Sequence, residues 1–283
     1  MLEPIDIDTA TLAHTLDLLG RGFPHRSPRF WEQALERVAR YNRCYGQRSI
    51  GQLLIIRRKP VGVMLTLCGQ SQHANGNHYK ITNLSSWYID PEHRRLAPLM
   101  LRDLVRAEDV VFTDLTPSDR VIPMLPLLGF RPLNSGIAAI GLPMAALSRA
   151  GDARVSDFET LEEGALMTDT RARMECNTEF GAMAAVLSVG GMQYPLLFVS
   201  RTLRQLPAAQ LIYCEDNALL KETIGAVARF LLKKGKLVLI LDIPINEQTP
   251  GVHFPRRGLK FAKGGCFDNR TDYAGSELLV VGQ

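Results

Sequence analysis

The sequence lacks the motifs of several large enzyme classes. It has no Walker phosphate loop, no Gly-x-Gly-x-x-Gly and no Gly-x-Ser-x-Gly, so nothing in it indicates a P-loop nucleotidase, a dinucleotide-binding domain or an α/β-hydrolase. The five cysteines are odd in number and form no Cys-x-x-Cys pair, which indicates reduced thiols rather than a disulfide framework or a zinc site. His73 and His78 have no third ligand nearby, so we expect no metal site.

Long apolar runs and a strong charge of one sign are also missing. No stretch approaches the roughly 20 apolar residues that span a bilayer. The first twelve residues carry three acids and no base, unlike a secretory signal. We therefore expect a cytoplasmic protein without a membrane span. The net charge of +4 is modest; it fits an anionic small ligand and gives no reason to expect nucleic acid as a partner.

The composition is that of a globular protein large enough for two domains. The chain has 283 residues, of which 46% are hydrophobic and 22% charged, and domains usually hold about 100–200 residues. The apolar pattern weakens over residues 148–158. We place the boundary there, with one domain at 1–147 and another at 155–283.

The first half reads as an alternation of helices and strands. Ser27 followed by Pro28 is typical of a helix start, and residues 52–67 have the pattern of a hairpin. The predicted elements are helices at 8–19, 27–41, 97–107 and 120–128, the hairpin at 52–67, and strands at 79–90, 110–114 and 137–140.

The second half repeats this order without repeating the sequence. It predicts helices at 161–176 and 218–233, a hairpin at 182–200, and strands at 210–214, 237–243 and 277–281. The predicted fold class is therefore α/β (α+β), with two domains that each hold a mixed sheet flanked by helices.

One segment of the first half carries a specific pattern. In SSWYIDPEHRRLAPLMLRDL, Trp87-Tyr88-Ile89 end a strand, Pro91-Glu92 make a turn, and Arg94 to Leu99 lead into a helix. A short strand, VVFTDLTP, and a helix ending in Leu128-Gly129-Phe130 follow. Over residues 1–145 this resembles the GNAT (N-acetyltransferase) superfamily. The resemblance implies an acyl-CoA-dependent acyltransferase with acetyl-CoA or another acyl-CoA as co-substrate, and the architecture of the second half suggests a tandem pair of GNAT-like domains.

The physical chemistry of the segment agrees with a CoA site. A helix start presents free N–H groups and partial positive charge to a pyrophosphate, and arginines add charge-assisted bonds to phosphate. A strand edge suits the amides of pantetheine. Two positions where the family has glycine are Ala97 and Leu99 here, and Pro98 offers no N–H. The candidate cofactor-binding residues are Trp87, Tyr88, Ile89, Arg94, Arg95, Leu96, Ala97 and Leu99.

The catalytic residues are less evident. The tyrosine that serves as acid in many family members aligns with Leu125, and an asparagine often found earlier falls near Ser118. Neither substitute is a useful acid. We take as catalytic candidates Ser86, on the central strand, and Asp114, at the end of the next strand, where it could accept a proton from an amine nucleophile. The further polar candidates nearby are Ser85 and His93.

The second half shows no sign of a cofactor site. At its strand-to-helix junction stand Glu215 and Asp216, which suit a helix N-terminus but would repel a pyrophosphate. We therefore expect this half to complete the fold and to wall an acceptor cleft between the halves. The run of residues 254–264 mixes cations with aromatics, and is either a clamp for an anionic or sugar-like acceptor or a solvated loop.

Three functions remain open from the sequence. The first is acyl transfer, with acetyl preferred, to an amine or hydroxyl of a small molecule or sugar. The second is a non-catalytic tandem GNAT-like protein that binds or scaffolds after losing acyl transfer, which the changed glycine positions and Leu125 favour. The third, nucleic-acid binding through the basic run, has the least support.

Overall fold

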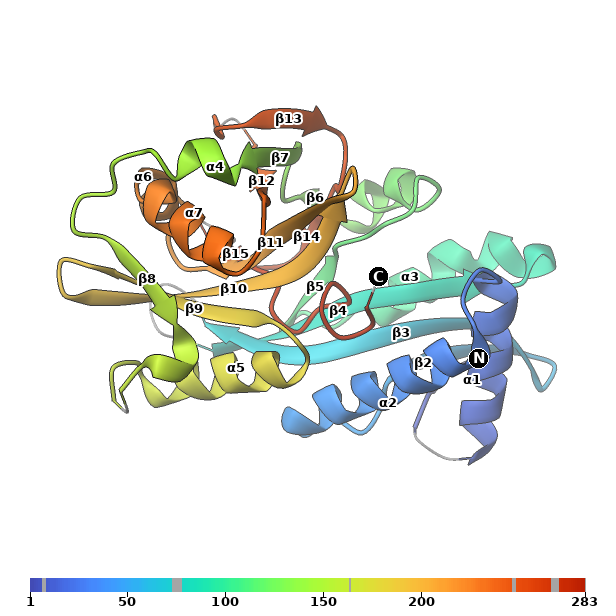
Figure 1. Ribbon diagram of the computed structural model, residues 1–283. Coiled ribbons are helices and arrows are strands. Elements are labelled where there is room, and N and C mark those ends of the chain that lie inside the picture. The colour runs from blue at the N-terminus through green and yellow to red at the C-terminus, as the bar shows by residue number, and fades with distance from the viewer. Residues whose placement is uncertain (7–8, 73–77, 163, 246–247, 266–269, 283) are drawn as a thin grey trace. The chain divides into compact units, whose positions relative to one another are not determined.

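The computed structural model describes residues 1–6, 9–72, 78–162, 164–245, 248–265 and 270–282 (Figure 1). The chain forms two compact units, and neither is one continuous segment. The first holds Met1–Pro132, Lys260–Cys266 and Gly275–Gln283; the second holds Leu133–Leu259 and Phe267–Ala274.

The first unit is a seven-stranded sheet in the order β1-β2-β3-β4-β5-β14-β6, in which only the β4–β5 pair is parallel. Helices α1 and α2 pack on β3. Its strands are β1 (Leu2–Pro4), β2 (Gly51–Ile56), β3 (Lys59–Gln72), β4 (His78–Ile89), β5 (Val110–Asp114), β6 (Arg131–Pro132) and β14 (Phe261–Lys263). Its helices are α1 (Thr9–Gly22), α2 (Pro28–Cys44) and α3 (Ala97–Leu104), with 3-10 turns η1 (Pro91–Leu96), η2 (Ile122–Met124) and η3 (Pro126–Leu128).

Local chemistry explains where these elements begin. Ser27 caps α2 as predicted, its hydroxyl accepting the Phe30 N–H at 3.2 Å. Trp31, Leu35 and Val38 then form a buried stripe that faces the sheet. The helix predicted at 120–128 is instead the two turns η2 and η3, because Pro123 and Pro126 lack the N–H that a continuous helix needs.

The second unit is an eight-stranded sheet in the order β13-β7-β12-β11-β10-β9-β8, with β15 paired to β11. The core is built on Phe198, Leu211, Val227, Leu231 and Leu239. Its strands are β7 (Gly136–Gly141), β8 (Arg154–Asp157), β9 (Met183–Val189), β10 (Met192–Leu203), β11 (Leu206–Cys214), β12 (Val238–Ile243), β13 (Val252–Pro255) and β15 (Thr271–Asp272). Its helices are α4 (Leu142–Ala145), α5 (Thr168–Glu179), α6 (Asn217–Glu222) and α7 (Ile224–Lys233), with the turn η4 (Phe158–Thr160).

Both sheets are mixed and carry helices, which confirms the predicted fold class. Two predicted helices are placed differently. The helix expected at 161–176 begins only at Thr168, after Gly164 with its φ of +91°. The helix expected at 218–233 breaks at Thr223, whose hydroxyl donates to the Leu219 carbonyl at 2.7 Å.

The units exchange strands, which the sequence did not indicate. Strand β7, predicted as the last strand of the first half, pairs with β12 and β13 of the second sheet. In return β14, from the C-terminal part of the chain, lies between β5 and β6 of the first sheet. The division therefore differs from a single predicted boundary near residue 150.

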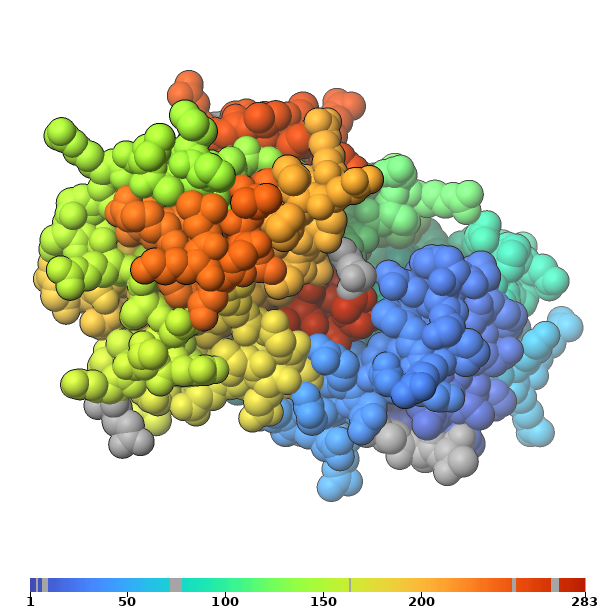
Figure 2. Space-filling model, in the orientation of Figure 1, coloured from blue at the N-terminus to red at the C-terminus, as the bar shows by residue number. Residues whose placement is uncertain are grey.

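Residues 277–281 are a series of turns, so the strand predicted there is wrong. This C-terminal segment belongs to the first unit. It is part of the small red surface bordered by the blue N-terminal residues in Figure 2.

Candidate functional site

The first unit contains a break in its sheet at the carboxyl ends of β4 and β5. Pairing between these parallel strands runs from Lys80 and Val110 to Leu84 and Asp114, whereas β4 continues to Ile89. The edge of β4 beyond Leu84 is thereby released from β5. Parallel strands that separate at their carboxyl ends commonly form a ligand crevice.

A β-bulge lies in the same stretch of β4. Val63 pairs with Tyr88 and Leu65 with Ser85, so Ser86 and Trp87 together lie opposite Met64. Ser86 has a φ of +48°, an uncommon value for a residue with a side chain. A bulge takes its extra residue out of the hydrogen-bond ladder and re-aims the neighbouring groups.

A pocket of about 400 Å³ opens beside the bulge, within the usual size of small-molecule sites. Both catalytic candidates predicted from the sequence, Ser86 and Asp114, line it. The other lining residues come from α2 and the segment before it, from β3, β4 and α3, from the chain after β5, and from the C-terminal segment: Phe23, His25, Arg26, Phe30, Trp31, Met64, Leu84, Ser85, Trp87, Leu101, Thr116, Pro117, Ser118, Val121, Glu277, Val281 and Gly282.

One wall of the pocket is aromatic. The rings of Phe23 and Phe30 lie 5.3 Å and 5.0 Å from that of Trp31, measured between ring centroids. The Arg26 guanidinium lies 4.6 Å from the centroid of Phe30. This wall gives the pocket an apolar surface with a cation at its side.

Two carboxyl groups of the pocket have pKa values well above those of exposed acids. Burial raises the pKa of Asp114 to about 7 although the Thr116 N–H stabilises its charge. Burial, with the nearby charge of Asp114, raises the pKa of Glu277 to about 8. Acids with such raised pKa values inside a cleft are typical of functional sites.

Thr116 connects the two carboxyl groups. Its hydroxyl donates to Glu277 Oε1 at 3.0 Å, and its backbone N–H bonds to the Asp114 carboxylate. Both acids are therefore bonded to one turn of the chain directly after β5.

The C-terminal segment is fixed in place by β4 and α2. The Glu277 N–H donates to Asn83 Oδ1 at 3.0 Å, and Asn83 itself donates to Thr113. Arg37 of α2 donates to the carbonyls of Val280 at 2.8 Å and Leu279 at 3.1 Å. These contacts hold Glu277 in the pocket wall.

Several buried polar atoms of lining residues have no hydrogen-bond partner in the described part of the chain. They are Glu277 Oε2 and the indole nitrogens of Trp31 and Trp87. Glu277 and Trp31 are each only 3% exposed. Buried polar groups normally find partners, so a ligand with a donor and acceptors would satisfy this pocket.

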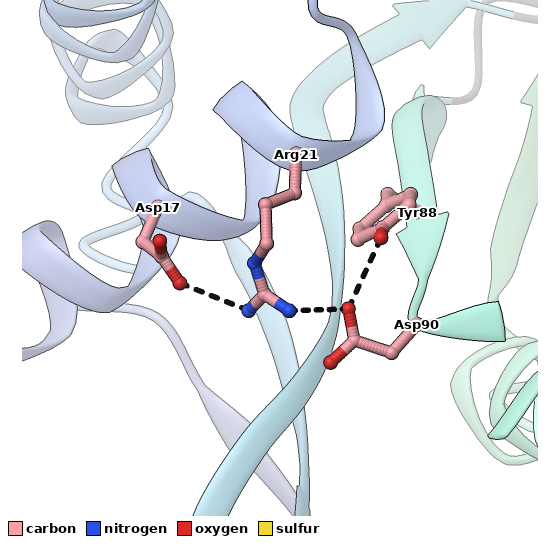
Figure 3. A network of polar contacts seen from close by, with 4 residues as sticks. All are labelled: Asp17, Arg21, Tyr88 and Asp90. Carbon is pink, nitrogen blue, oxygen red and sulfur yellow. Dashed lines mark hydrogen bonds and ion pairs between the residues drawn. The ribbon is translucent and has the colours of Figure 1, made fainter. Parts of the chain in front are cut away.

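The three residues predicted to line a pantetheine chain have different surroundings. Trp87 lines the pocket, whereas Ile89 is buried. The Tyr88 hydroxyl donates to Asp90 Oδ1 at 3.0 Å, and Arg21 binds the same oxygen at 2.5 Å and Asp17 at 2.9 Å (Figure 3). Burial and this carboxylate raise the pKa of Tyr88. Tyr88 thus joins the end of β4 to α1.

The predicted pyrophosphate seat is a 3-10 turn that runs into α3. The Ala97 N–H donates to the Arg94 carbonyl, so that donor is already used. Leu99 is 45% exposed and does not fill the seat, and Leu96 is half-buried. Arg94 and Arg95 are exposed, and neither forms an ion pair with a described residue. The positive charge of the seat therefore comes from these two side chains.

Leu125 and Ser118 stand at the positions where the resemblance places a tyrosine and an asparagine. Leu125 is fully buried, so no acid replaces the tyrosine there. Ser118 and Ser85 line the pocket, whereas His93 does not. Sequence reasoning missed Glu277 because it took residues 277–281 for a strand; an acid inside an otherwise apolar run was the available signal.

In the second unit, the position equivalent to this break in the sheet is occupied. Pairing between β11 and β12 ends at Gln210 and Ile240, and β15 pairs with β11 at Tyr213 and Cys214. Asp216 caps α6 by accepting the N–H groups of Ala218 and Leu219. The strand edge at this position is therefore covered, unlike the edge of β4 in the first unit.

The basic run at 254–264 contributes strands to both sheets. Phe254 and Pro255 pair with β7, and Phe261 to Lys263 pair with β5. Lys260 is buried, and Lys263 donates to the Val105 carbonyl at 2.8 Å. Residues 260–262 are therefore part of the packed structure, whereas Arg256 and Arg257 are exposed.

The described residues carry neither a candidate metal cluster nor a helix suited to span a membrane. They contain no group of three or more His, Cys, Asp or Glu side chains suited to a metal ion. His73 lies outside the described residues and His78 is exposed at the start of β4. No described helix combines the length and apolar character needed to cross a membrane.

Comparison with known proteins identifies the fold. No family model matches the chain, and no curated protein matches it. Among solved structures, it is similar to a GCN5-related N-acetyltransferase from Anabaena variabilis, with 7% identity, a TM-score of 0.58, and coverage of 93% of this chain and 72% of that one.

Two further structures give the same result. A conserved protein of unknown function from Enterococcus faecalis, described as a probable N-acyltransferase, has 10% identity, a TM-score of 0.56, and coverage of 93% and 72%. A GCN5-related N-acetyltransferase from Kribbella flavida has 12% identity, a TM-score of 0.55, and coverage of 93% and 70%. The chain therefore has a GNAT fold, with two GNAT-like halves.

Proposed function

We propose that the protein is an acyl-CoA-dependent acyltransferase whose reaction takes place in the pocket of the first unit. The observation that carries this proposal is the coincidence of three features: the separation of β4 from β5, the bulge at Ser86, and the half-buried Asp114 that lines the pocket. Each has a distinct use in acyl transfer from a thioester.

The freed edge of β4 suits the donor. Its backbone groups beyond Leu84 can bond the amides of a pantetheine chain, as a strand edge binds an extended peptide. Arg94 and Arg95 follow the end of β4 and would bind the phosphates as charge-assisted donors. The bulge would leave an N–H of Ser86 or Trp87 free to stabilise the oxyanion of the thioester carbonyl.

The pocket suits a small acceptor. A volume of about 400 Å³ holds an acetyl group together with a compact molecule that bears an amine or hydroxyl. Asp114 and Glu277 would repel an anion buried among them, so an amine or a neutral hydroxyl compound is favoured over the anionic acceptor that the net charge suggested. Arg26 and His25, from the segment between α1 and α2, also line the pocket.

Acyl-CoA binding is measured directly through tryptophan fluorescence. The sequence has two tryptophans, Trp31 and Trp87, and both line the pocket. We expect acetyl-CoA to change the emission saturably and, with an acceptor panel, to release thiol. Binding without thiol release for every acceptor would instead support a non-catalytic binding protein, for which the buried Leu125 argues.

The role of the two arginines is tested with a shortened donor. Replacing both Arg94 and Arg95 by Ala removes up to two charge-assisted bonds, each worth roughly tenfold in binding. We expect KM for acetyl-CoA to rise about 10–100-fold, while KM for acetyl-pantetheine, which has no pyrophosphate, stays unchanged. Arg106→Ala, at another exposed arginine, is the control. An equal effect on both donors would show that the arginines do not bind phosphate.

A further inference from the structure

The reaction proposed above needs a base and an acid, and the usual acid is missing. An amine or hydroxyl loses a proton when it attacks a thioester, and the leaving sulfur needs one. Leu125 cannot donate a proton and is fully buried. The pocket instead holds two carboxyl groups, one at the end of β5 and one delivered by the C-terminal segment.

We propose that Asp114 and Glu277 share one proton and together act as both the base and the acid of acyl transfer, an inference that rests on the proposed function. The geometry carries it. Both side chains line the same pocket, both bond to Thr116, and Glu277 Oε2 is buried without a partner in the described part of the chain. Both side chains thus line the pocket in which the donor and acceptor would meet.

The two carboxyl groups cannot both ionise freely at neutral pH. The pKa of Asp114 is raised to about 7 and that of Glu277 to about 8. Between these values the pair holds one proton, because ionising the second group places two negative charges in one buried site.

The catalytic step balances without any further reactant. The carboxylate takes the proton of the acceptor N–H or O–H while its nitrogen or oxygen forms a bond to the thioester carbonyl carbon. The C–S bond breaks, and the carboxylic acid gives its proton to the sulfur, which leaves as a thiol. The pair begins and ends with one proton, and only its position within the pair has changed.

Few other charged or titratable side chains line the pocket beside Asp114 and Glu277. Of the described lining residues, His25 and Arg26 are the other titratable side chains, and both come from the segment between α1 and α2. Arg37 of α2 bonds to the carbonyls of Leu279 and Val280. Lys260 is the buried residue before β14, and Lys263, the last residue of β14, donates to the Val105 carbonyl. Strands β3 and β4 and helix α3 contribute no charged lining residue to the described wall.

The pH dependence and two isosteric variants test the pair. We expect kcat to be greatest between about 7 and about 8, since lower pH removes the base and higher pH removes the acid. Asp114→Asn and Glu277→Gln should each lower kcat at least about 100-fold and abolish this narrow maximum. Glu108→Gln, at an exposed acid of the same unit, is the control. Variants that keep the activity and pH profile of the parent would overturn the proposal.

The leaving group separates the acid role from a structural one. An aromatic thioester releases a thiolate that needs no protonation, so the loss in both variants should shrink with this donor while the attack still needs a base. A loss of equal size with both thioesters would contradict the acid role. Circular dichroism of each variant shows whether it folds as the parent does.

A measurement on the free protein keeps the inference separate from the proposed function. The infrared carbonyl band of a protonated carboxyl should persist at neutral pH and vanish as the pH rises. In Asp114→Asn the Glu277 band should vanish at lower pH, because its repulsive neighbour is gone. Absence of that band at neutral pH would refute the shared proton even if acyl transfer occurs; a parent protein with the band but no acyl transfer would refute the proposed function.

Discussion

Two glycines near the end of α1 differ in what surrounds them. A Cβ atom at Gly20 would meet nothing within 4 Å, whereas one at Gly22 would lie 2.5 Å from Cγ of Tyr88. The absence of a side chain at Gly22 therefore lets α1 approach the end of β4. That approach places Arg21 within reach of Asp90 (Figure 3).

Replacing each glycine by alanine should have opposite effects on stability. Gly20→Ala should raise the free energy of unfolding by about 0.5–1 kcal/mol, because alanine loses less backbone entropy in a helix. Gly22→Ala should lower it by about 1–3 kcal/mol through overpacking. Urea denaturation followed by circular dichroism measures both. Equal changes in the free energy of unfolding would mean that the contact with Tyr88 does not exclude a side chain at residue 22.

At the same scale, the site was only half predictable. Asp114 and Ser86 could be found because they stand at the ends of strands with a clear apolar pattern. Glu277 is 163 positions beyond Asp114 along the chain, and no local pattern shows that its segment returns to the first unit. Tertiary contacts with Asn83, Thr116 and Arg37 bring it there.

Helices and strands with a strong hydrophobic periodicity were predicted well. Segments whose backbone conformation depends on local hydrogen bonds were not. Strand β5 has the predicted bounds, 110–114, and α2 has the predicted cap. By contrast, the basic loop after Ile89 is the 3-10 turn η1, which uses the Ala97 N–H that the phosphate was expected to bind. Backbone hydrogen bonding of this kind leaves no periodic signal in a sequence.

The C-terminal segment depends on close packing against α2. Gly275 has a φ of +69°, and a Cβ atom there would lie 1.6 Å from the Tyr41 hydroxyl oxygen. Tyr41 is buried in α2. The segment therefore needs glycine at this point to place Glu277, which follows two residues later, in the pocket wall.

We expect Gly275→Ala to displace this segment and reduce acyl transfer about as strongly as Glu277→Gln does. Gly46→Ala is a matched control. Gly46 has a φ of +70° and open space around it, so alanine there should lower the free energy of unfolding only through backbone strain, by roughly 1–2 kcal/mol. Steady-state kinetics at a temperature where both variants remain folded measures the difference. Equal activities would show that Glu277 does not depend on this contact.

For the whole molecule, the exchange of β7 and β14 makes each sheet depend on distant parts of the chain. The sheet of the first unit is continuous only when β14 lies between β5 and β6. Strand β7 contributes Ala138 and Ile140, both buried, to the second sheet. Neither half of the sequence contains all the strands of one sheet, although each half alone has the pattern of a GNAT-like domain.

The predicted domain 1–147 should therefore not fold alone. It lacks β14, which leaves one edge of β5 unpaired, and it carries β7 without β12, which exposes apolar residues. We expect a poorly dispersed amide NMR spectrum for this fragment. Adding a peptide of residues 255–283, which supplies β14 and the C-terminal segment, should increase the dispersion, whereas a scrambled peptide should not. A well-dispersed spectrum from 1–147 alone would show that the first sheet forms without β14 and that this prediction is wrong.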